Sequence, residues 1–264
     1  MHPPSARHAP VKSRFTIRAC RSHDDFLSCL ELQKRIWGYA ESELYPARLF
    51  VNLTKVGGLV LGAFAPTEIM IGFAAAMPAW RDGQRYFHSL ALGVTPRHER
   101  RGIGKALKWE QRRRALRAGI DLIEWTFDPM QARNAFFNIE RLGAVAGRFV
   151  ENYYGAVQSR LQQGLPSDRL ICEWHLRSQR VRRAARGLSP RSDNLKGTVL
   201  APVPPSFATI AASRPTEARA LQASVRRRLV GHFRRGFVIT GFVSDNLGGS
   251  YVLERIPKLI RNSP

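Results

Sequence analysis

The chain has 264 residues, of which 44% are apolar and 23% are charged. This suffices for one large or two modest domains with a buried core, which excludes a wholly disordered chain and a small scaffold held by disulfides or metal ions. The sequence contains 42 lysines and arginines, 35 of them arginine, against 20 acidic residues, so the formal net charge is +22. Such a charge attracts nucleic acid, anionic membrane or phosphorylated small molecules without identifying one of them.

The cysteines and the N-terminal segment bear on the cellular compartment. Cys20, Cys29 and Cys172 are odd in number and not closely spaced, so we expect buried free thiols and a reducing, cytoplasmic setting rather than disulfides or a metal site. Residues 1–13 contain no apolar stretch, which predicts a flexible basic tail and not a signal peptide. No window approaches the ~18 uninterrupted apolar residues of a membrane span. We therefore expect neither a membrane nor a metal ion as a partner.

The first part of the chain, residues 14–177, alternates between strand and helix periods. We predict strands at 15–19, 58–64, 69–80, 84–94, 121–127, 148–154 and 169–176, and helices at 23–37, 102–117 and 131–142, with a mixed loop or short helix at 38–55. Ser22 is the expected N-cap of the first helix. Short connections within 58–94 favour antiparallel hairpins. The order indicates an α/β (α+β) fold with a mixed, mainly antiparallel sheet flanked by helices.

The second part of the chain is smaller. Residues 178–196 are basic and turn-rich, which predicts a linker that begins with a frayed helix. Residues 197–264 predict a small α+β extension. Its expected elements are a strand at 197–202, a helix at 215–235 and a hairpin formed by 236–243 and 249–254. Because so few residues form only a marginally stable independent domain, we expect this extension to dock on the first part.

The segment from residue 90 to residue 107 joins a strand to a helix through a basic loop. Gly102 and Gly104 remove side chains where the first amides of the helix lack intrahelical acceptors, so these amides can converge on a phosphate. The cationic side chains around them are Arg97, His98, Arg100, Arg101 and Lys105. The pattern suits a pyrophosphate; the alternative is a turn that glycine softens for packing. The P-loop motif fails because Ala106 follows Lys105, and the Rossmann motif fails because residue 107 is leucine.

The pattern Val94-x-Pro96-x5-Gly102-Ile103-Gly104-x-Ala106-Leu107, after three antiparallel strands, resembles the acyl-CoA-binding motif of the GNAT superfamily of N-acetyltransferases. The resemblance extends in element order over residues 14–177 and includes Glu140-Arg141-Leu142-Gly143. Segments such as Asn152-Tyr153-Tyr154-Gly155 are similar to a poorly characterised branch of predicted bacterial acyltransferases in this superfamily. Some relatives of that branch are associated with N-acylation of amino acids.

The resemblance implies a sheet whose fourth and fifth strands splay apart around acetyl-CoA or another acyl-CoA. The backbone of Leu92, Gly93 and Val94 would hold the pantetheine and the thioester carbonyl. The pyrophosphate would lie against residues of the loop and helix start, namely Arg100, Arg101, Gly102, Ile103, Gly104 and Lys105. The sequence departs from the family at three positions. Glu99 stands where Gln or Arg is usual, Arg100 where Gly is common, and Ile139 where a Tyr is proposed as the acid toward the leaving thiolate.

His88, Tyr153 and Tyr154 are the candidate catalytic residues. His88 lies fourteen residues before Gly102, where some family members carry a glutamate base, and a strand period places it on one face with Tyr86, Leu90, Leu92 and Val94. A hydrogen-bonded strand histidine without a catalytic role is the alternative. Tyr153 and Tyr154 have opposite faces if the backbone is extended, so at most one of them could protonate the thiolate while the other packs in the core.

Asp128 and Asn134 are candidate substrate-binding residues, with a strand end and a local helix cap as the respective alternatives. Asp168 and Arg169 form a substrate-carboxylate element or an ordinary ion pair. The basic segments at 180–186 and 226–228, with Arg234 and Arg235, contain few aromatic residues. We therefore interpret them as solvated helix faces, with polyanion contact as the alternative.

Together these features predict an acyl-CoA-dependent N-acyltransferase that transfers an acetyl or other short acyl group, such as succinyl, to a small amine in a ternary complex. An amino acid is one candidate acceptor, and a homodimer is one candidate assembly. The alternative is a catalytically silent module on the same scaffold that binds acyl-CoA or, through its charge, nucleic acid. A CoA-binding measurement and a salt-dependent DNA titration separate the two hypotheses.

Overall fold

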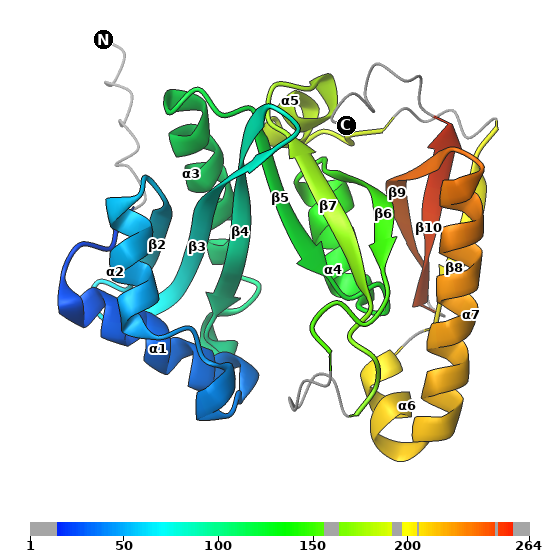
Figure 1. Cartoon of the computed structure of the whole chain (residues 1–264), viewed down its shortest axis with the longest axis horizontal. Coiled ribbons are helices and arrows are strands. Elements are labelled where there is room, and N and C mark those ends of the chain that lie inside the picture. The colour runs from blue at the N-terminus through cyan, green and yellow to red at the C-terminus, as the bar shows by residue number, and fades with distance from the viewer. Residues whose placement is uncertain (1–14, 156–163, 192–196, 205, 246–247, 256–264) are drawn as a thin grey trace, which may run out of the picture.

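The computed structural model describes residues 15–155, 164–191, 197–204, 206–245 and 248–255. The predicted tail at 1–13 and residues 192–196 of the predicted linker lie outside this part of the chain. The described strands form one sheet in the order β1-β2-β3-β4-β5-β7-β6-β9-β10-β8 (Figure 1). The strands are β1 (Thr16–Ala19), β2 (Leu59–Phe64), β3 (Met70–Arg81), β4 (Gln84–Val94), β5 (Leu122–Phe127), β6 (Val145–Val150), β7 (Arg169–His175), β8 (Val199–Val203), β9 (Phe237–Asp245) and β10 (Gly248–Arg255).

The helices lie between these strands in the chain. They are α1 (His23–Trp37), α2 (Ala47–Lys55), α3 (Ile103–Arg117), α4 (Ala132–Phe136), α5 (Gln179–Ala185), α6 (Phe207–Ser213) and α7 (Pro215–Arg234), with short 3₁₀ helices η1 (Glu41–Glu43) and η2 (Pro96–His98) and a π-helical segment η3 (Phe137–Arg141) that continues α4. The mixed sheet flanked by helices that the sequence predicts is confirmed. The sequence did not predict α6.

The start and end of α1 follow from local chemistry. The Ser22 side chain accepts a hydrogen bond from the Asp25 N–H, and the Asp25 carboxylate accepts one from the Ser22 N–H in return. This reciprocal cap satisfies two amides that the helix leaves free. Gly38 ends the helix in the left-handed region at φ 63°, where glycine carries no Cβ penalty. The predicted helix at 23–37 therefore has the predicted bounds.

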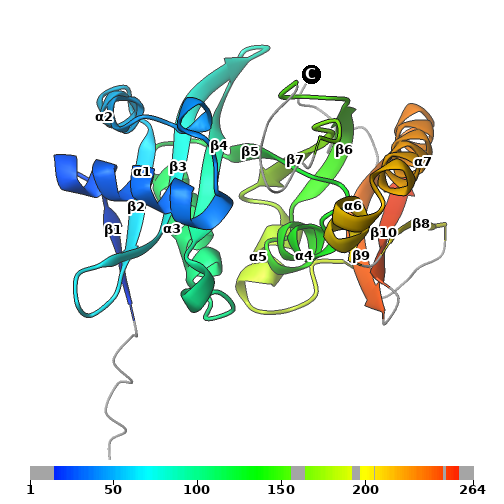
Figure 2. The ribbon, with the colours of Figure 1, turned by 90° about the horizontal axis from the view of Figure 1, so that it is seen from below.

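The helices of the first half cover both faces of β1–β4. Figure 2 shows α1 and α2 on one face and α3 on the other. The α1 and α2 face buries Phe26, Leu32 and Phe50 against Phe73 and its neighbours. The α3 face buries Ile103 and Leu107 against residues of β2 and β3. Strands β1–β4 are thus held between two apolar layers, which fixes the position of β4 at their edge.

Strands β4 and β5 are parallel and pair only at Phe87 with Ile123 and at His88 with Glu124. Beyond this point the two strands separate. On its other side β4 stays paired with β3, but the register shifts where Ala75 opposes Ala91 and Ala76 opposes Ser89, so Leu90 is an extra residue. A bulge of this kind bends the strand and re-aims its side chains.

The bulge corrects one expectation for β4. A regular strand would place His88 and Leu90 on one face with Leu92 and Val94. Leu90 instead packs against the α1 and α2 face, whereas Leu92 and Val94 pack against the α3 face. The extra residue shifts the alternation by one. The prediction that His88 shares a face with Leu92 and Val94 is therefore wrong.

The C-terminal extension continues the sheet. Antiparallel β8, β9 and β10 follow β6, and β9 pairs with β6 at Ile239 opposite Ala146. Helix α7 packs on β6, β8 and β9. The buried apolar cluster of the second half includes Leu229 of α7, Ile239 of β9 and Trp174 of β7. One core therefore spans the boundary between 14–177 and 197–264, although the division into domains stays a prediction.

Three smaller predictions can also be compared with the structure. Strand β6 ends at Val150, so the predicted strand at 148–154 is too long, and Tyr153 and Tyr154 lie in a turn. Their expected placement on opposite faces of a strand is wrong. The three cysteines are free and buried, as expected. No helix in the described ranges is long and apolar enough to cross a membrane.

Candidate active site

The separation of β4 and β5 opens a cavity of about 480 Å³. Its wall includes Trp37 at the end of α1 and Lys108 on α3. Because α1 and α3 lie on opposite faces of the sheet, the cavity passes through the gap between the two strands. The lining residues are Trp37, Tyr39, Glu43, Tyr45, Ser89, Leu90, Ala91, Leu92, Lys108, Trp125, Thr126, Phe127, Asp128, Gln131, Asn134, Phe137, Asn138, Tyr154 and Arg169.

The N-terminus of α3 is open and has no side-chain cap from the described residues. Gly102 is the N-cap at φ 82°, a left-handed conformation that favours glycine, and a Cβ built on it would meet nothing within 4 Å. The first helical hydrogen bond runs from the Ala106 N–H to the Gly102 carbonyl. The amides of Ile103, Gly104 and Lys105 therefore precede the helical ladder, and no described side chain caps them. Space, free amides and the helix dipole together suit a diphosphate.

Glu99 and Arg100, which depart from the family pattern, are accommodated at this loop. Glu99 forms an ion pair of 3.1 Å with Arg133 of α4, so its charge has a cationic partner. Arg100 adopts φ 60°, a conformation that is strained for a residue with a side chain and explains why glycine suits this position. Ile139 is fully buried in the core and does not line the cavity.

Lys108 is the unexpected member of the cavity wall. Its side chain is 1% exposed, its Nζ donates to Ser89 Oγ at 3.0 Å, and the nitrogen lies 3.7 Å from the centroid of the Trp125 ring. No ion pair joins it to a carboxylate within the described ranges. Burial lowers the pKa of Lys108 to about 7, because a buried ammonium loses its hydration without a counter-charge.

His88 lies near the point where β4 and β5 part, but it is not part of the cavity lining. Burial lowers the pKa of His88, and the nearby charges of Lys108 and Arg81 act in the same direction while Glu124 opposes them. The lowered pKa favours the neutral imidazole, which is the form that can accept a proton.

A buried carboxylate lies beside His88. Glu124 of β5 accepts a hydrogen bond of 3.0 Å from Arg81 and also pairs with Arg148, which reaches Glu173 at 2.8 Å. Burial alone would raise the pKa of Glu124, but the two guanidinium groups outweigh it and lower the pKa below its ordinary value. Glu124 is thus a fixed anion that ties β3, β5 and β6 together.

Tyr154 reaches the cavity from a turn after β6. Its hydroxyl lies 2.9 Å from Thr126 Oγ1 on β5, and its ring packs edge-on against Tyr153 with centroids 4.7 Å apart. The Tyr154 N–H donates to Ser167 Oγ at 2.8 Å, and the Tyr153 N–H donates to the Ser167 carbonyl. The turn that carries both tyrosines is therefore held by Ser167.

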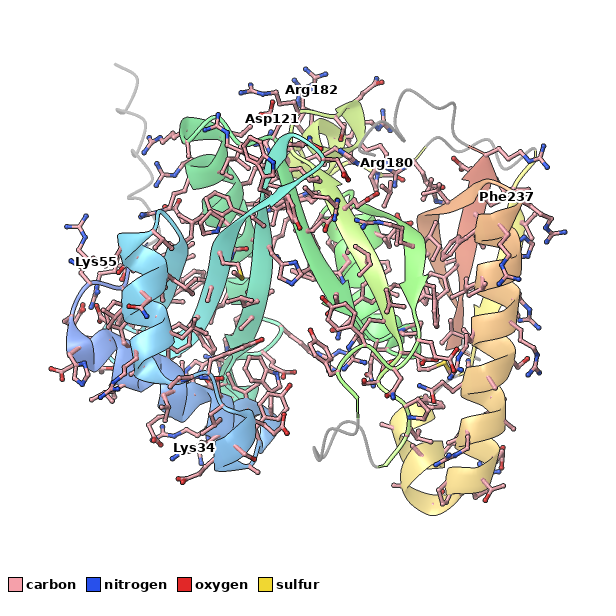
Figure 3. The ribbon with its side chains drawn as sticks, in the orientation of Figure 1. Lys34, Lys55, Asp121, Arg180, Arg182 and Phe237 are labelled. Carbon is pink, nitrogen blue, oxygen red and sulfur yellow. The ribbon has the colours of Figure 1, made fainter. Side chains whose placement is uncertain are left out.

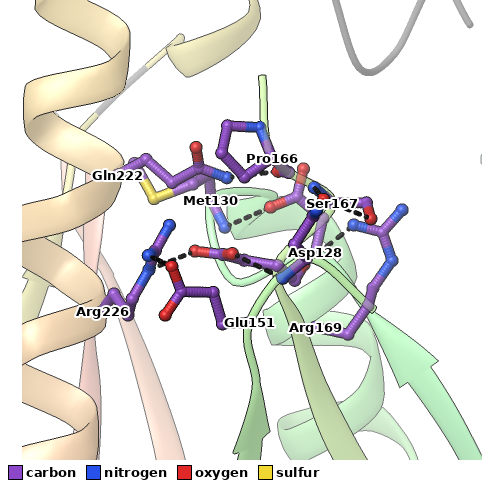
Figure 4. A network of polar contacts seen from close by, with 10 residues as sticks. Asp128, Met130, Glu151, Pro166, Ser167, Arg169, Gln222 and Arg226 are labelled. Atoms are coloured by element: carbon purple, nitrogen blue, oxygen red, sulfur yellow. Dashed lines mark hydrogen bonds and ion pairs between the residues drawn. The ribbon is translucent and has the colours of Figure 1, made fainter. Parts of the chain in front are cut away.

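Helix α7 holds the segment that contains Ser167 (Figure 4). Arg226 Nε lies 2.9 Å from Asp168 Oδ2, and Arg226 also pairs with Glu151. Gln222 donates to the Pro166 carbonyl at 2.8 Å. Asp168 is fully buried and accepts a hydrogen bond from the Asn152 N–H. We call Arg226, Gln222 and Asp168 the α7 clasp. Asp168 is thus engaged in an ion pair with Arg226 of α7.

Asp128 and Asn134 both line the cavity. Asp128 Oδ1 accepts a hydrogen bond from the Met130 N–H, and burial raises the pKa of the carboxyl group while this bond opposes the rise. Asp128 therefore ends its strand with a local turn and still faces the cavity that Arg169 also lines. The structural interpretation of Asp128 is confirmed, and its role in substrate binding stays a prediction.

The basic segments are distributed over the molecule and partly engaged. Figure 3 shows Arg180 and Arg182 near α5, and Lys34 and Lys55 at the α1 and α2 end. Arg180 donates to the Thr240 carbonyl, and Arg226 belongs to the α7 clasp. These contacts favour intramolecular bonds and solvated helix faces over one continuous basic surface that binds nucleic acid.

Sequence reasoning missed Lys108, the Glu124 cluster and the wall formed by Trp37, Tyr39 and Tyr45. One signal for Lys108 was available. The helix buries Ile103, Leu107, Gln111 and Ala115 at four-residue spacing, and Lys108 stands next to this stripe at the position that follows Gly104 by one turn. Because lysine is almost never fully buried without a partner, this position marks Lys108 as a candidate functional residue.

The open strand pair and the glycine loop at the head of α3 define the class of fold found in N-acetyltransferases. Residues 26–144 match the sequence model described as the Acetyltransferase (GNAT) family. None of the curated proteins compared with the chain matches it. This match supports the GNAT superfamily for residues 26–144.

Three solved structures are similar to the chain. The ribosomal-protein-S5-alanine acetyltransferase of Vibrio fischeri is 12% identical, with a TM-score of 0.52 over 63% of this chain and 95% of that one. The ribosomal-protein-S18-alanine N-acetyltransferase of Escherichia coli is 16% identical over 61% and 94%, with a TM-score of 0.47. An E. coli GNAT family N-acetyltransferase in complex with CoA is 18% identical over 69% and 91%, with a TM-score of 0.43. The first of these carries the comparison, and it concerns the fold alone.

Proposed function

We propose that the chain is an acyl-CoA-dependent N-acyltransferase that acts on a small amine by direct transfer. The observation that carries the proposal is the open anion site at Gly102 next to a cavity that passes between β4 and β5. A diphosphate bound at Gly102 would bring its connected thioester arm within reach of this cavity. The acyl group is acetyl or another short group such as succinyl.

The co-substrate would lie along β4. The amides of Ile103, Gly104 and Lys105 take the pyrophosphate, with Arg100 and Arg101 close to them. After His88, β4 pairs with none of the described strands on its β5 side, so the backbone of Leu92, Gly93 and Val94 can bond the pantetheine amides and the thioester carbonyl. Backbone N–H groups aimed at that carbonyl also stabilise the oxyanion that forms when the amine attacks.

The acceptor would enter from the end of the cavity lined by Trp37, Tyr39 and Tyr45. Glu43 and Asp128 supply acidic groups for an ammonium, and Arg169 supplies a guanidinium for a carboxylate. Charges of both signs around one cavity complement a zwitterion, which supports an amino acid as acceptor. Asn134 adds a polar contact from α4.

The acceptor must lose a proton before its nitrogen can attack the thioester. His88 is the proposed base, acting through water because it does not line the cavity. Tyr153 and Tyr154 are proposed to shape the acceptor side, where the Tyr154 hydroxyl meets Thr126. His88→Ala should lower kcat about 100-fold with little change in CoA affinity, measured by steady-state kinetics and calorimetry. An unchanged kcat removes His88 from the mechanism.

The direct test is release of free thiol from acetyl-CoA and succinyl-CoA with a panel of amines, together with CoA titration by calorimetry. We expect saturable CoA binding and amine-dependent thiol release. Absence of CoA binding contradicts the proposal. Binding without turnover across the panel supports the silent-module alternative, and a steep salt dependence of DNA affinity would then identify nucleic acid as its partner.

A charge reversal at the anion site tests where the diphosphate lies. Gly102→Asp should weaken CoA binding at least tenfold, or about 1.4 kcal/mol, because its carboxylate would face the phosphates. Gly102→Asn is the matched control, since asparagine has the same size and tolerates the left-handed conformation without a charge. Equal affinities of the two variants would place the phosphates elsewhere.

A further inference from the structure

The mechanism proposed above leaves the leaving thiolate without a proton donor. When the thioester C–S bond breaks, the electron pair goes to sulfur, and an aliphatic thiolate is basic enough, with a thiol pKa of about 8.5, to benefit from protonation. The position at which the GNAT resemblance places a tyrosine donor is Ile139, which is buried in the core and absent from the cavity wall.

Two side chains with exchangeable protons approach the point where β4 and β5 part. Tyr154 reaches Thr126, whose neighbour Trp125 faces the other side of β5 by strand alternation. Lys108 packs on that other side, over the Trp125 ring. This is the side of α3, whose N-terminus carries the proposed diphosphate site, so a thioester arm that enters from there meets Lys108 first.

Lys108 is also held in place for such a role. Its Nζ donates one hydrogen bond to Ser89 Oγ at 3.0 Å, and Gln111 lies 3.5 Å from the same hydroxyl. Ser89 directly follows the last β4 residue that pairs with β5. The ammonium therefore sits at the narrow end of the opening, where the reacting end of a bound thioester arm would arrive.

We propose that Lys108 is the proton donor to the leaving thiol of CoA. This inference rests on the proposed acyltransferase function. The acceptor nitrogen forms the new C–N bond, the C–S bond breaks, and the sulfur takes a proton from the Lys108 ammonium, which becomes a neutral amine. The protons that the acceptor nitrogen loses go to the base and to solvent, and one of them restores the Lys108 ammonium before the next cycle.

The surroundings of Lys108 suit a group that gives up a proton near neutral pH. Burial lowers the pKa of Lys108 to about 7, close to the value at which a donor and its conjugate base interconvert readily. The titratable groups that its charge affects are Cys172 on β7 and His88 on β4, while Ser89, Gln111 and Trp125 are neutral. The donor form is the ammonium, so we expect kcat to fall as the pH rises through the pKa of Lys108 in the complex.

The experiment compares Lys108→Met and Lys108→Arg with the wild-type chain. Lys108→Met should lower kcat with acetyl-CoA about 100-fold, leave CoA affinity within about threefold and remove the alkaline fall of the kcat profile. Lys108→Arg should be equally slow, because arginine keeps the charge but does not release a proton in this range. Arg117→Met, which removes an exposed charge from the same helix, is the control and should retain the wild-type rate.

A second thioester separates proton donation from a structural role. With an acetyl thioester of an acidic arenethiol, whose thiolate leaves without protonation, the wild-type and Lys108→Met rates should differ by no more than about threefold. An equal loss with both thioesters, a Lys108→Arg variant that recovers the rate, or an unchanged alkaline limb in Lys108→Met would each overturn the proposal. A wild-type chain that does not bind CoA or release thiol would instead overturn the proposed function itself.

Discussion

The sheet has two sparsely paired junctions, and they differ in what fills them. Strands β4 and β5 pair at Phe87–Ile123 and His88–Glu124, and β6 and β9 pair at Ala146–Ile239. The first junction opens into a cavity that contains Lys108, Asp128 and Tyr154. The second, which we call the β6–β9 seam, is closed by side chains.

The β6–β9 seam is packed from both partners. Ile239 and Leu229 are fully buried, and a Cβ built on Gly147 would lie 3.3 Å from Val238. Two strands that separate therefore form a site only where polar side chains surround an open cavity. At the seam, apolar contact takes the place of backbone hydrogen bonds and joins the extension to the rest of the molecule.

The largest expected effect tests the seam as a structural joint. Leu229→Ala should lower the free energy of unfolding by about 2 to 5 kcal/mol, because it leaves a cavity in the buried cluster. Chemical denaturation measures this loss, and calorimetry should show unchanged CoA affinity in the folded fraction. A loss below about 1 kcal/mol would mean that the seam is not tightly packed.

The next effect concerns the α7 clasp, through which the extension reaches the cavity wall. Arg226→Met should destabilise the chain by about 2 kcal/mol, since the buried Asp168 loses a charged hydrogen-bond partner. Arg227→Met is the matched control, because Arg227 is exposed on the same helix, and it should stay within about 0.5 kcal/mol of wild type. Equal thermal shifts in the two variants would show that the clasp contributes nothing.

The smallest effect distinguishes the open junction from the seam by its pH dependence. Below pH 7 Lys108 is charged in both the folded and the unfolded chain, so folding carries the full cost of a buried charge. Between its folded pKa of about 7 and an unfolded value of about 10.4 the folded chain binds fewer protons, so stability rises with pH.

Lys108→Met removes this cost. The variant should therefore be more stable than wild type by about 1 kcal/mol at pH 6, and the gain should shrink steadily as the pH rises above about 7. Thermal unfolding at several pH values measures the difference. A gain that grows as the pH rises would show that Lys108 is not buried as a charge.

The parts of the fold that the sequence predicted are those decided by local chemistry. The strand at 84–94 and the helix at 23–37 have strong periodicity and clear end signals, and both have the predicted bounds. The open start of α3 at Gly102 was predictable for the same reason, because glycine spacing and a following helix lie within a few residues.

The parts that it did not predict depend on contacts between distant segments. The extra residue at Leu90 follows from the register of β3 against β4, and no single-strand pattern contains that register. Tyr154 owes its position to Ser167, and Asp168 owes its partner to α7. The place of Lys108 beside the buried stripe of α3 follows from the sequence, but its contacts with Ser89 and Trp125 depend on strands β4 and β5.

The position of β9 beside β6 has a consequence for self-association. An edge strand of a sheet can pair with an identical strand of another molecule. Here β6 lies between β7 and β9, and the outermost described strands are β1 and β8. A dimer built by joining sheets would have to use one of these two margins, one at each far side of the molecule, which would keep the opening between β4 and β5 clear of the second copy.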